Sequence, residues 1–492
     1  MDVFEIRRVG RELGRFAGEF DDCFGRCDTA AHLKVYVRGQ NSNLHRKSVE
    51  PMALQAGVAP RTLQAFLSLL EWDEQRMVQR VQQIVMRDHA SPRAIGIVDE
   101  TASPKKGNHT SGVGRQWCGR LGKVDNCVVS VHAGYAAGRF HCLMDRDLFL
   151  PKSWADDPAR RAEVGIPEEV VHRTKPQIAL EQIRRALANG VRVAAWTADE
   201  HYGQSYAFQD GLEALGQTYV LEVPVSFCGW AASPPLVHRA TPAEMRRPGR
   251  KRRHPRLAKT APPVSEVRDL LRHSPALRDQ PWTPIEIKQG EKGPLVREVK
   301  AIPFWMRRQG LPTRPHWLIV GRDPEKPDEV KFFVSNAPAG DPLEWLTYVA
   351  YSRWPIEQCF QEDKDELGFD HFEVRGWRAI HRHMSLTLVS HLFLNRMHVR
   401  LTEQERAQEE AGLFFPAGRR RRSAHLSRGE PDRRSNPLGG RGLAGGVGRR
   451  SAGSAAAAGK GRSHPELHAL AQCVGEAMSH EEQDRETACP RH

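Results

Sequence analysis

The chain has 492 residues, of which 39% are hydrophobic and 27% are charged, and its formal net charge is +13. That share of apolar residues is enough to build a core, which excludes disorder of the whole chain. No apolar run approaches the roughly 20 residues of a membrane span, and the N-terminus has no signal-peptide pattern, so we expect a soluble, cytoplasmic protein with no membrane partner.

The first predicted unit is helical and covers residues 1–90. Apolar residues recur at spacings of three and four over residues 48–82, which predicts helices. The segment GVAP at residues 57–60 breaks this pattern and indicates a turn. Two helices joined by a tight turn are typical of a helix-turn-helix, although any small helical bundle has the same pattern. We therefore interpret residues 1–90 as a candidate DNA-binding domain.

Residues 91–224 alternate between strand-like and helical patterns. The expected strands are 94–98, 127–133, 139–144, 191–197 and 219–223, and the expected helices are 176–189 and 206–215. The two runs at 127–133 and 139–144, joined through Gly134 and Gly138, are predicted to form a hairpin. This order of elements predicts an α/β fold with a mixed sheet.

Residues 225–340 break that rhythm. Short alternating or β-branched runs separated by proline and glycine predict a β-rich insertion. Within it, residues 246–259 hold eight Lys or Arg and no acidic residue. Clustered Lys and Arg indicate a phosphate-rich partner, although a solvated basic loop would have the same composition.

The last third of the chain has two parts. Helical patterns return over residues 341–400, which we assign to the final helices of the α/β unit, expected at 343–351, 354–367 and 377–397. Residues 401–492 are rich in Arg, Gly, Ala and Ser, and the stretch 419–462 holds twelve Lys or Arg against two acidic residues. This composition predicts a basic, low-complexity tail that is disordered.

Two carboxylates follow apolar runs of the α/β unit. Asp99 stands in GIVDET and Asp199 in WTADEHYG. A carboxylate at the C-terminal end of a strand faces the crevice where α/β sheets place their sites. An acidic pair is also a common way to end a strand, but two such positions in one unit favour a shared site. The adjacent Glu100 and Glu200 are expected to point to the opposite faces.

A third carboxylate lies in the segment YSRWPIEQCFQEDKDELG. Pro355 is tolerated in the first turn of a helix, so a helix is predicted to begin near Ser352. At about 100° per residue, Glu357 and Lys364 lie within about 20° of one line along the helix, and Arg353 lies about 40° from it. The three side chains therefore share one helical face, a pattern that a surface salt-bridge ladder would also give.

Three carboxylates around one crevice suit divalent cations, because hard Mg²⁺ or Mn²⁺ prefers oxygen ligands. Two such ions would activate a water or a 3′-hydroxyl and stabilise the leaving oxygen in a phosphodiester displacement. Lys364 and Arg353 would hold backbone phosphates beside the ions. The predicted chemistry is hydrolysis or transfer of a phosphodiester.

This set of residues resembles the DDE transposases of bacterial insertion sequences. It is most similar to the cut-and-paste branch that has a Tyr-Arg-Glu-Lys signature and a β-rich insertion before the final Glu. The loop PKKGNHTSGVGRQWCGRLGKVDNC and the block RWPIEQCFQEDKDELGFDHFEVRGW are the most specific matches. The resemblance covers about residues 30–398. The residues that carry it are Asp99, Asp199, Tyr351, Arg353, Glu357 and Lys364.

The resemblance implies a ribonuclease H-like core whose first strand bears Asp99, whose fourth bears Asp199 and whose following helix bears Glu357. It implies that these three residues are catalytic and hold two Mg²⁺ or Mn²⁺ ions. Relatives nick DNA with water, and the freed 3′-hydroxyl then attacks, often through a hairpin intermediate, before strand transfer into a target.

The resemblance also implies the partners. These are double-stranded DNA, as terminal inverted repeats and as target, and a second copy of the chain in a homodimer assembled on DNA, associated with the nucleoid. The implied DNA contacts are Arg353, Lys364, Tyr351, Lys105 and Lys106. In relatives the insertion supplies aromatic residues that stack on a flipped base. The candidates here are Trp230, Trp305 and Trp317, although a tryptophan in such a segment is more often part of the core.

Two other functions stay open from the sequence. A decayed element would leave a catalytically inactive DNA-binding protein that keeps the helical N-terminus and the basic segments. A glycosidase with two carboxylates would explain Asp99 and Asp199 but not the basic segments. All three carboxylates and Lys364 are present in the chain, which favours the transposase.

Overall fold

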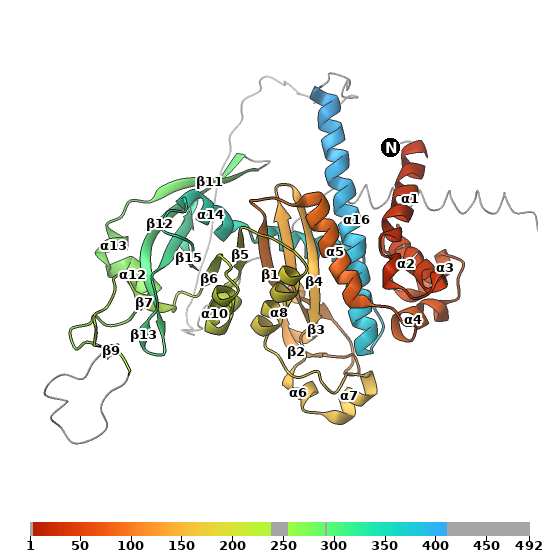
Figure 1. Ribbon diagram of the computed structural model, residues 1–492, viewed down its shortest axis with the longest axis horizontal. Coiled ribbons are helices and arrows are strands. Elements are labelled where there is room, and N and C mark those ends of the chain that lie inside the picture. The colour runs from red at the N-terminus through yellow and green to blue at the C-terminus, as the bar shows by residue number, and fades with distance from the viewer. Residues whose placement is uncertain (1–2, 238–253, 291–292, 411–492) are drawn as a thin grey trace, which may run out of the picture.

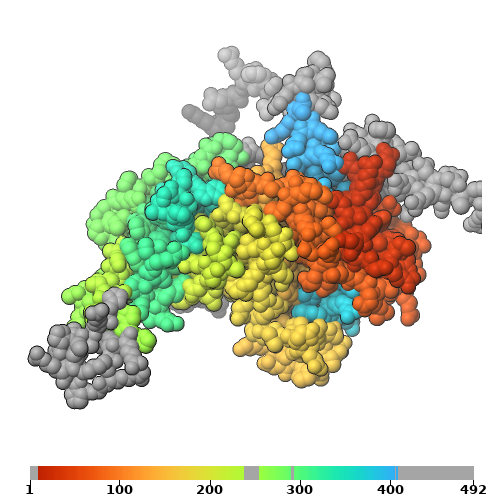
Figure 2. Space-filling model, viewed as in Figure 1, coloured from red at the N-terminus to blue at the C-terminus, as the bar shows by residue number. Residues whose placement is uncertain are grey.

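One mixed sheet runs through the computed structural model, which describes residues 3–237, 254–290 and 293–410 (Figure 1). Helices at the N-terminus and C-terminus of this part pack at one end of the sheet, and the β-rich insertion extends it at the other (Figure 2). Residues 246–253 of the basic segment and residues 411–492 of the predicted tail lie outside the described residues.

The N-terminal helices surround a core of apolar side chains that includes Leu33 and Phe66. They are α1 (Val3–Gly18), η1 (Asp21–Cys23), α2 (Cys27–Gln40), α3 (Val49–Gln55), α4 (Pro60–Ser68) and α5 (Glu74–His89). A turn separates α3 from α4, as the sequence predicts, and Gly57 takes a positive φ of 62° in it. Helix α4 already begins at Pro60, because proline is accepted at the first helical position.

The central strands are β1 (Ile95–Pro104), β2 (Gly114–Cys118), β3 (Lys123–Ala137), β4 (Phe140–Leu148), β5 (Ala195–Ala198) and β6 (Tyr219–Val223). They lie in the order β4–β3–β1–β5–β6. Strands β1, β5 and β6 run parallel, whereas β3 is antiparallel to both β1 and β4. This arrangement confirms the predicted α/β class with a mixed sheet and agrees with the ribonuclease H-like core that the resemblance implies.

Two details of these strands differ from the sequence prediction. The hairpin of β3 and β4 turns at Gly138 alone, whereas Gly134 lies within β3 at an irregularity of the pairing. Strand β2 was not predicted. Its five residues, GRQWC, are mostly polar, and it forms only because the first half of the long β3 offers it a pairing edge.

Short helices connect the central strands. They are α6 (Lys152–Ala155), α7 (Pro158–Val164), α8 (Lys175–Ala188), α9 (Glu200–Gly203) and α10 (Tyr206–Ala214). Helix α8 begins with a capping box formed by Thr174 and Gln177. Its Gln182 donates to the carbonyl of Val131 in β3, which fixes α8 against the sheet.

The insertion continues the same sheet rather than forming a separate one. Strand β15 pairs antiparallel with β6, and the order then runs β15–β14–β12–β7–β10. Its elements are β7 (Cys228–Trp230), β8 (Leu236–Val237), β9 (Arg256–Leu257), β10 (Ser265–Glu266), α12 (Val267–His273), α13 (Pro275–Arg278), β11 (Thr283–Gly290), β12 (Gly293–Arg308), β13 (Leu311–Pro312), β14 (His316–Asp323) and β15 (Lys326–Ser335).

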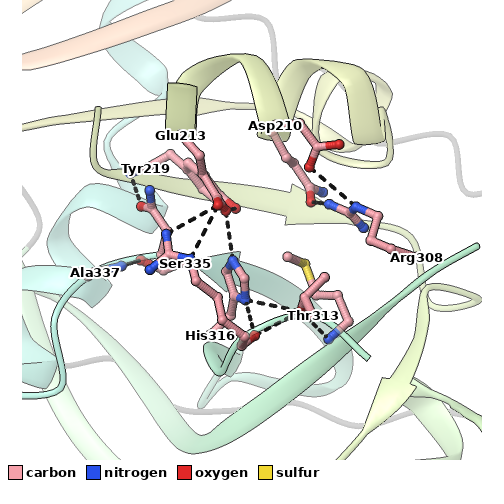
Figure 3. A network of polar contacts seen from close by, with 12 residues as sticks. Asp210, Glu213, Tyr219, Arg308, Thr313, His316, Ser335 and Ala337 are labelled. Atoms are coloured by element: carbon pink, nitrogen blue, oxygen red, sulfur yellow. Dashed lines mark hydrogen bonds and ion pairs between the residues drawn. The ribbon is translucent and has the colours of Figure 1, made fainter. Parts of the chain in front are cut away.

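A polar seam also joins the insertion to the core (Figure 3). Glu213 of α10 lies at its centre: the Tyr219 hydroxyl donates to Oε1 over 2.9 Å, and His316 Nε2 of β14 lies 2.8 Å from the same oxygen. Arg314 Nη2 lies 3.2 Å from Oε2. Nearby, Arg308 of β12 pairs with Asp210 of α10. These contacts hold the insertion in a fixed position against the core.

Three helices complete the fold: α14 (Leu343–Tyr351), α15 (Trp354–Asp365) and α16 (Trp377–Glu410). The predicted boundary of the tail at residue 401 is wrong, because α16 continues to Glu410. The residues LTEQERAQEE at 401–410 contain no glycine or proline and are mostly good helix formers, so the helix propagates through them. Within the described residues, no helix has both the length and the apolar character needed to cross a membrane.

We predict that Glu213→Gln lowers the stability of the protein by about 1–3 kcal/mol at neutral pH, because it weakens several hydrogen bonds at one partly buried carboxylate. Burial raises the pKa of Glu213, but the hydrogen bonds from His316 and Tyr219 outweigh it and leave the pKa below the usual 4.5. A lowered pKa stabilises the folded protein above the unfolded value, so the difference between variant and unmutated protein should shrink below about pH 4.5.

Thermal melting across pH measures this effect. Asp210→Asn is the matched control, since Asp210 is exposed and its single ion pair with Arg308 spans 3.4 Å. If Glu213→Gln and Asp210→Asn lowered the melting temperature equally, the stability of the seam would not depend on Glu213.

Candidate active site

Asp99, Asp199 and Glu357 line one cleft of about 510 Å³. Asp99 lies in β1, Asp199 lies between β5 and α9, and Glu357 lies in the first turn of α15. Residues separated by more than 250 positions in the chain are thus brought to one place. The cleft is open to solvent at Glu357, whose side chain is 55% exposed.

The sequence pattern predicted that Asp99 follows its strand. In the structure Asp99 lies inside the strand, β1. Strand β1 pairs with β5 only from Ile95 to Val98, so Asp99 is the first residue beyond that parallel ladder. Beyond this point β1 continues to Pro104 because antiparallel β3 still pairs with it on the other side. Asp99 therefore still occupies the sheet end at which a site is expected.

Asp199 is fixed by the short helix that follows it. Its Oδ1 accepts hydrogen bonds from the backbone N–H groups of His201 over 3.0 Å and of Tyr202 over 3.4 Å. The helix α9 packs directly on β6 at Gly203, where a Cβ atom would overlap the carbonyl oxygen of Glu222. Only glycine permits this approach, and the approach sets the position of Asp199.

Helix α15 is held from behind by a buried polar network. Glu362 accepts hydrogen bonds from Gln358 over 2.7 Å and from Asn395 over 3.2 Å, and His141 lies 3.4 Å away. Burial raises the pKa of Glu362, but His141 and the other donors outweigh it and lower the pKa to about 2. A charged Glu362 fixes the buried face of α15 and leaves Glu357 on the opposite face, toward the cleft.

Arg353 links two of the three carboxylates. Its Nη1 lies 2.6 Å from Asp99 Oδ2, and its Nη2 lies 2.6 Å from Glu357 Oε1. Burial raises the pKa of Asp99 to about 7; Arg353 opposes that rise, whereas Asp199 adds to it. Burial also raises the pKa of Asp199. The cleft therefore holds more acidic groups than Arg353, Lys364 and Arg120 can neutralise together.

The donor chemistry fits a divalent cation, because carboxylate oxygens converge in a cleft with an excess of negative charge. In the part of the chain that the structure describes, however, no group of three or more His, Cys, Asp or Glu side chains has an arrangement that could hold a metal ion. Arg353 lies between two of the predicted ligands, within 2.6 Å of both Asp99 and Glu357. The three-carboxylate metal site stays a prediction.

The predicted DNA-contacting lysines have different surroundings. Lys364 lines the cleft, and its Nζ donates to Thr101 Oγ1 over 2.6 Å. Lys105 does not line it: its Nζ donates to the carbonyl of Phe372 over 2.7 Å, and burial lowers its pKa to about 8. Lys105 thus binds a loop of its own chain, and its contact with DNA stays a prediction. Lys106 is exposed.

Tyr351 has different surroundings again. It does not line the cleft but packs on the insertion, with its ring 5.3 Å from that of Phe333 and its hydroxyl in the space left by Gly321. That hydroxyl is buried and has no hydrogen-bond partner among the described residues. In this arrangement Tyr351 joins α14 to the extended sheet, and its contact with DNA stays a prediction.

Trp117 and Arg120, which the sequence did not single out, also line the cleft. Glu100, which was expected to point to the opposite face from Asp99, lines the same cleft. It binds Lys175 Nζ and accepts from the Tyr202 hydroxyl, each over 2.6 Å. Trp117 is an aromatic residue in a polar, glycine-rich stretch of the sequence. That contrast could have marked Trp117 as a candidate residue of the cleft.

The tryptophans of the insertion are less accessible. Trp230 is buried, and its Nε1 donates to the carbonyl of Pro262. Trp305 pairs with Trp230 between β12 and β7, and Trp317 is half-buried in β14. These placements favour the core role that the sequence left open.

Comparisons with known proteins give two matches to this chain. The family model of the DDE superfamily endonucleases matches residues 19–294, a range that includes Asp99 and Asp199 but not Glu357. A probable transposase for insertion sequence element IS701 from Microchaete diplosiphon is 30% identical over 184 residues. The aligned region is 37% of this chain and 46% of that relative, so the chain matches less than half of the length of the relative.

We predict that Asp99→Asn raises the melting temperature by a few degrees near pH 8 in EDTA. Because the folded pKa of about 7 exceeds the ordinary value of 3.8, the folded protein holds a proton that the unfolded chain releases, and stability falls as pH rises between these values. The asparagine variant does not lose stability in this way, so the melting temperatures of the two proteins should become equal near pH 4. A variant that melts lower at every pH would contradict the burial argument.

Proposed function

The chain belongs to the DDE superfamily endonucleases, and from that premise we propose that it is an insertion-sequence transposase. It cuts DNA at the ends of its element and transfers the freed strands to a target. The observation that carries this proposal is the convergence of Asp99, Asp199 and Glu357 in one cleft that also contains Lys364.

The catalytic roles follow from the position of each group. Asp99, Asp199 and Glu357 would hold Mg²⁺ or Mn²⁺, in the predicted form two ions, and such ions supply a deprotonated attacking oxygen and stabilise the leaving one. Lys364 lies in the last turn of α15, whereas Arg353 precedes its first turn. The side chains of Lys364 and Arg353 can therefore hold phosphates on either side of the reacting bond. Arg353 then exchanges its carboxylate partners for a phosphate when DNA and metal bind.

The proposed partner is double-stranded DNA, both as terminal inverted repeats and as target. The α3–α4 pair supports DNA binding at the N-terminal end, where Arg61 and Gln64 are exposed on α4. Assembly as a homodimer on DNA and a place in the cytoplasm, at the nucleoid when DNA is bound, belong to the same proposal. The basic segment 246–259 adds positive charge on the insertion.

One observation favours a second function, that of a catalytically inactive DNA-binding protein. The Arg353 bridge between Asp99 and Glu357 leaves no three-carboxylate group ready for metal within the described residues. If that bridge does not open, the protein binds DNA without cutting it. The two functions differ in one measurable property, cleavage by the unmutated protein.

We predict that the purified full chain, mixed with Mg²⁺ and DNA carrying the repeats that flank its coding region, nicks that DNA at the element boundary. Asp99→Ala, Asp199→Ala and Glu357→Ala should each reduce the rate by roughly a thousandfold or more, because the three act as a unit. DNA affinity should be kept in all three.

Glu200→Ala is the matched control, since Glu200 is exposed beside Asp199 and does not line the cleft. It should cut at the normal rate. Tight binding of the repeats without any nicking by the unmutated protein would instead support the inactive DNA-binding protein.

We further predict that Arg353→Gln binds Mn²⁺ roughly tenfold or more tightly in the absence of DNA, because it removes a positive charge beside two carboxylates. Isothermal titration measures this change, with Lys106→Gln as a control that removes an exposed charge outside the cleft. Arg353→Gln should also cut DNA more slowly, since it lacks the phosphate contact of Arg353. Unchanged Mn²⁺ affinity would show that Arg353 does not compete with the ion.

A further inference from the structure

Helix α4 is the second helix of the candidate helix-turn-helix formed by α3 and α4. In such a pair the second helix contacts base edges with residues near its N-terminus. Arg61 and Gln64, near the N-terminus of α4, are exposed, whereas Phe66 and Leu67, near its C-terminus, are buried. DNA that is bound on α4 is presented to the cleft at one defined bond only if α4 has a fixed position relative to the cleft.

One buried guanidinium holds the C-terminal end of α4. Arg382 of α16 is 3% exposed. Its Nη1 donates to the carbonyls of Phe66 and Leu67, each over 3.3 Å, and to that of Leu70 over 2.7 Å. Its Nη2 donates to the carbonyl of Trp72 over 3.3 Å. The last carbonyls of a helix have no partner within the helix, so Arg382 supplies partners to the end of α4 and to the turn that follows it.

The contacts of this guanidinium fix its orientation. Its carbon Cζ lies 4.5 Å from the centre of the Trp72 ring, and its Nε lies 4.0 Å from Glu74 Oε2. An apolar side chain of similar volume often stabilises a core as well as a buried charge does. It cannot supply direction, whereas a planar guanidinium donates along fixed N–H bonds. Arg382 therefore fixes the distance and the rotation of α4 against α16.

The same helix also holds the cleft. Helix α16 packs on β4 and on α4 (Figure 1). His391 lies nine residues after Arg382, about 14 Å farther along the helix. Its Nδ1 lies 2.6 Å from Oδ1 of Asp363, on the buried face of α15. Helix α16 is thus a rigid connection between α4 and the helix that carries the third carboxylate.

We propose that Arg382 is a positioning residue that locks α4 to α16 and so holds DNA bound on α4 in one register against the three carboxylates. This inference rests on the proposed function and adds what sets the spacing between the recognised base pairs and the cleaved bond. Arg382 acts through α4 and α16 and does not contact the DNA itself.

Two DNA probes test the proposal, using the full chain in EDTA so that nothing is cut. The natural probe is a duplex of the flanking repeat and the element boundary. The spaced probe has five base pairs inserted between the boundary and the rest of the repeat, which turns the two parts by about half a helical turn. The unmutated protein should bind the natural probe roughly tenfold or more tightly than the spaced one, because a rigid connection reaches both parts only at the natural spacing.

Arg382→Met keeps an unbranched apolar side chain but removes every hydrogen bond to α4, so its preference for the natural probe should fall below about threefold. Arg378→Met is the matched control. Arg378 lies one turn earlier in α16, and its exposed ion pair with Glu71 spans 3.5 Å, so this variant should keep the full preference. Arg382→Lys can still donate to α4, and its preference should lie between those of the unmutated protein and Arg382→Met.

A full preference for the natural probe in Arg382→Met, or an equal loss of affinity for both probes, would overturn the role of Arg382. If Arg382→Met does not fold, a full preference in Arg382→Lys overturns it in the same way. Equal binding of the two probes by the unmutated protein would overturn the fixed register.

Because the readout needs no cleavage, it separates this inference from the proposed function. An unmutated protein that prefers the natural probe but does not cut it in Mg²⁺ would support the register and count against the proposed cleavage. An unmutated protein that binds neither probe would overturn both.

Discussion

The candidate site depends on the length of one parallel ladder. Strands β1 and β5 pair over four residues each, from Ile95 to Val98 and from Ala195 to Ala198, and the ladder stops where the two aspartates begin. Parallel strands in register end at the same edge of a sheet, so Asp99 and Asp199 meet there. Every further feature of the cleft, from the cap of α9 to the docking of α15, is arranged around these two carboxylates.

The charges in the cleft are unevenly balanced. Lys175 and Tyr202 bind Glu100, and Arg353 is shared between Asp99 and Glu357, whereas Asp199 is held by backbone N–H groups. Burial makes each negative charge costly, and the raised pKa values of Asp99 and Asp199 follow from that cost. A site with this imbalance gains free energy from an added cation, which is the physical basis for expecting divalent metal here.

The continuous sheet has a mechanical consequence. Because β15 pairs with β6, and β6 pairs with β5, hydrogen bonds connect the insertion to the strand that precedes Asp199. The seam around Glu213 adds polar contacts between α10 and β14. The insertion is therefore rigidly placed relative to the cleft, and DNA bound along it would have a fixed register against the carboxylates.

The local pattern of the sequence was enough to predict most of the central strands and longer helices, and to single out the three carboxylates that line the cleft. Helix α14 has the predicted bounds, and the strand-end positions of Asp99 and Asp199 were visible because apolar runs and acidic residues are neighbours in the chain. Contacts between distant residues decided the rest. Lys105 donates to the carbonyl of Phe372, and the Tyr351 hydroxyl fits in the space left by Gly321. Strand β2 exists only because β3 pairs with it. Periodicity along a chain specifies its elements and which faces they bury, but the partner of each side chain is set only when the sheet and helices pack together.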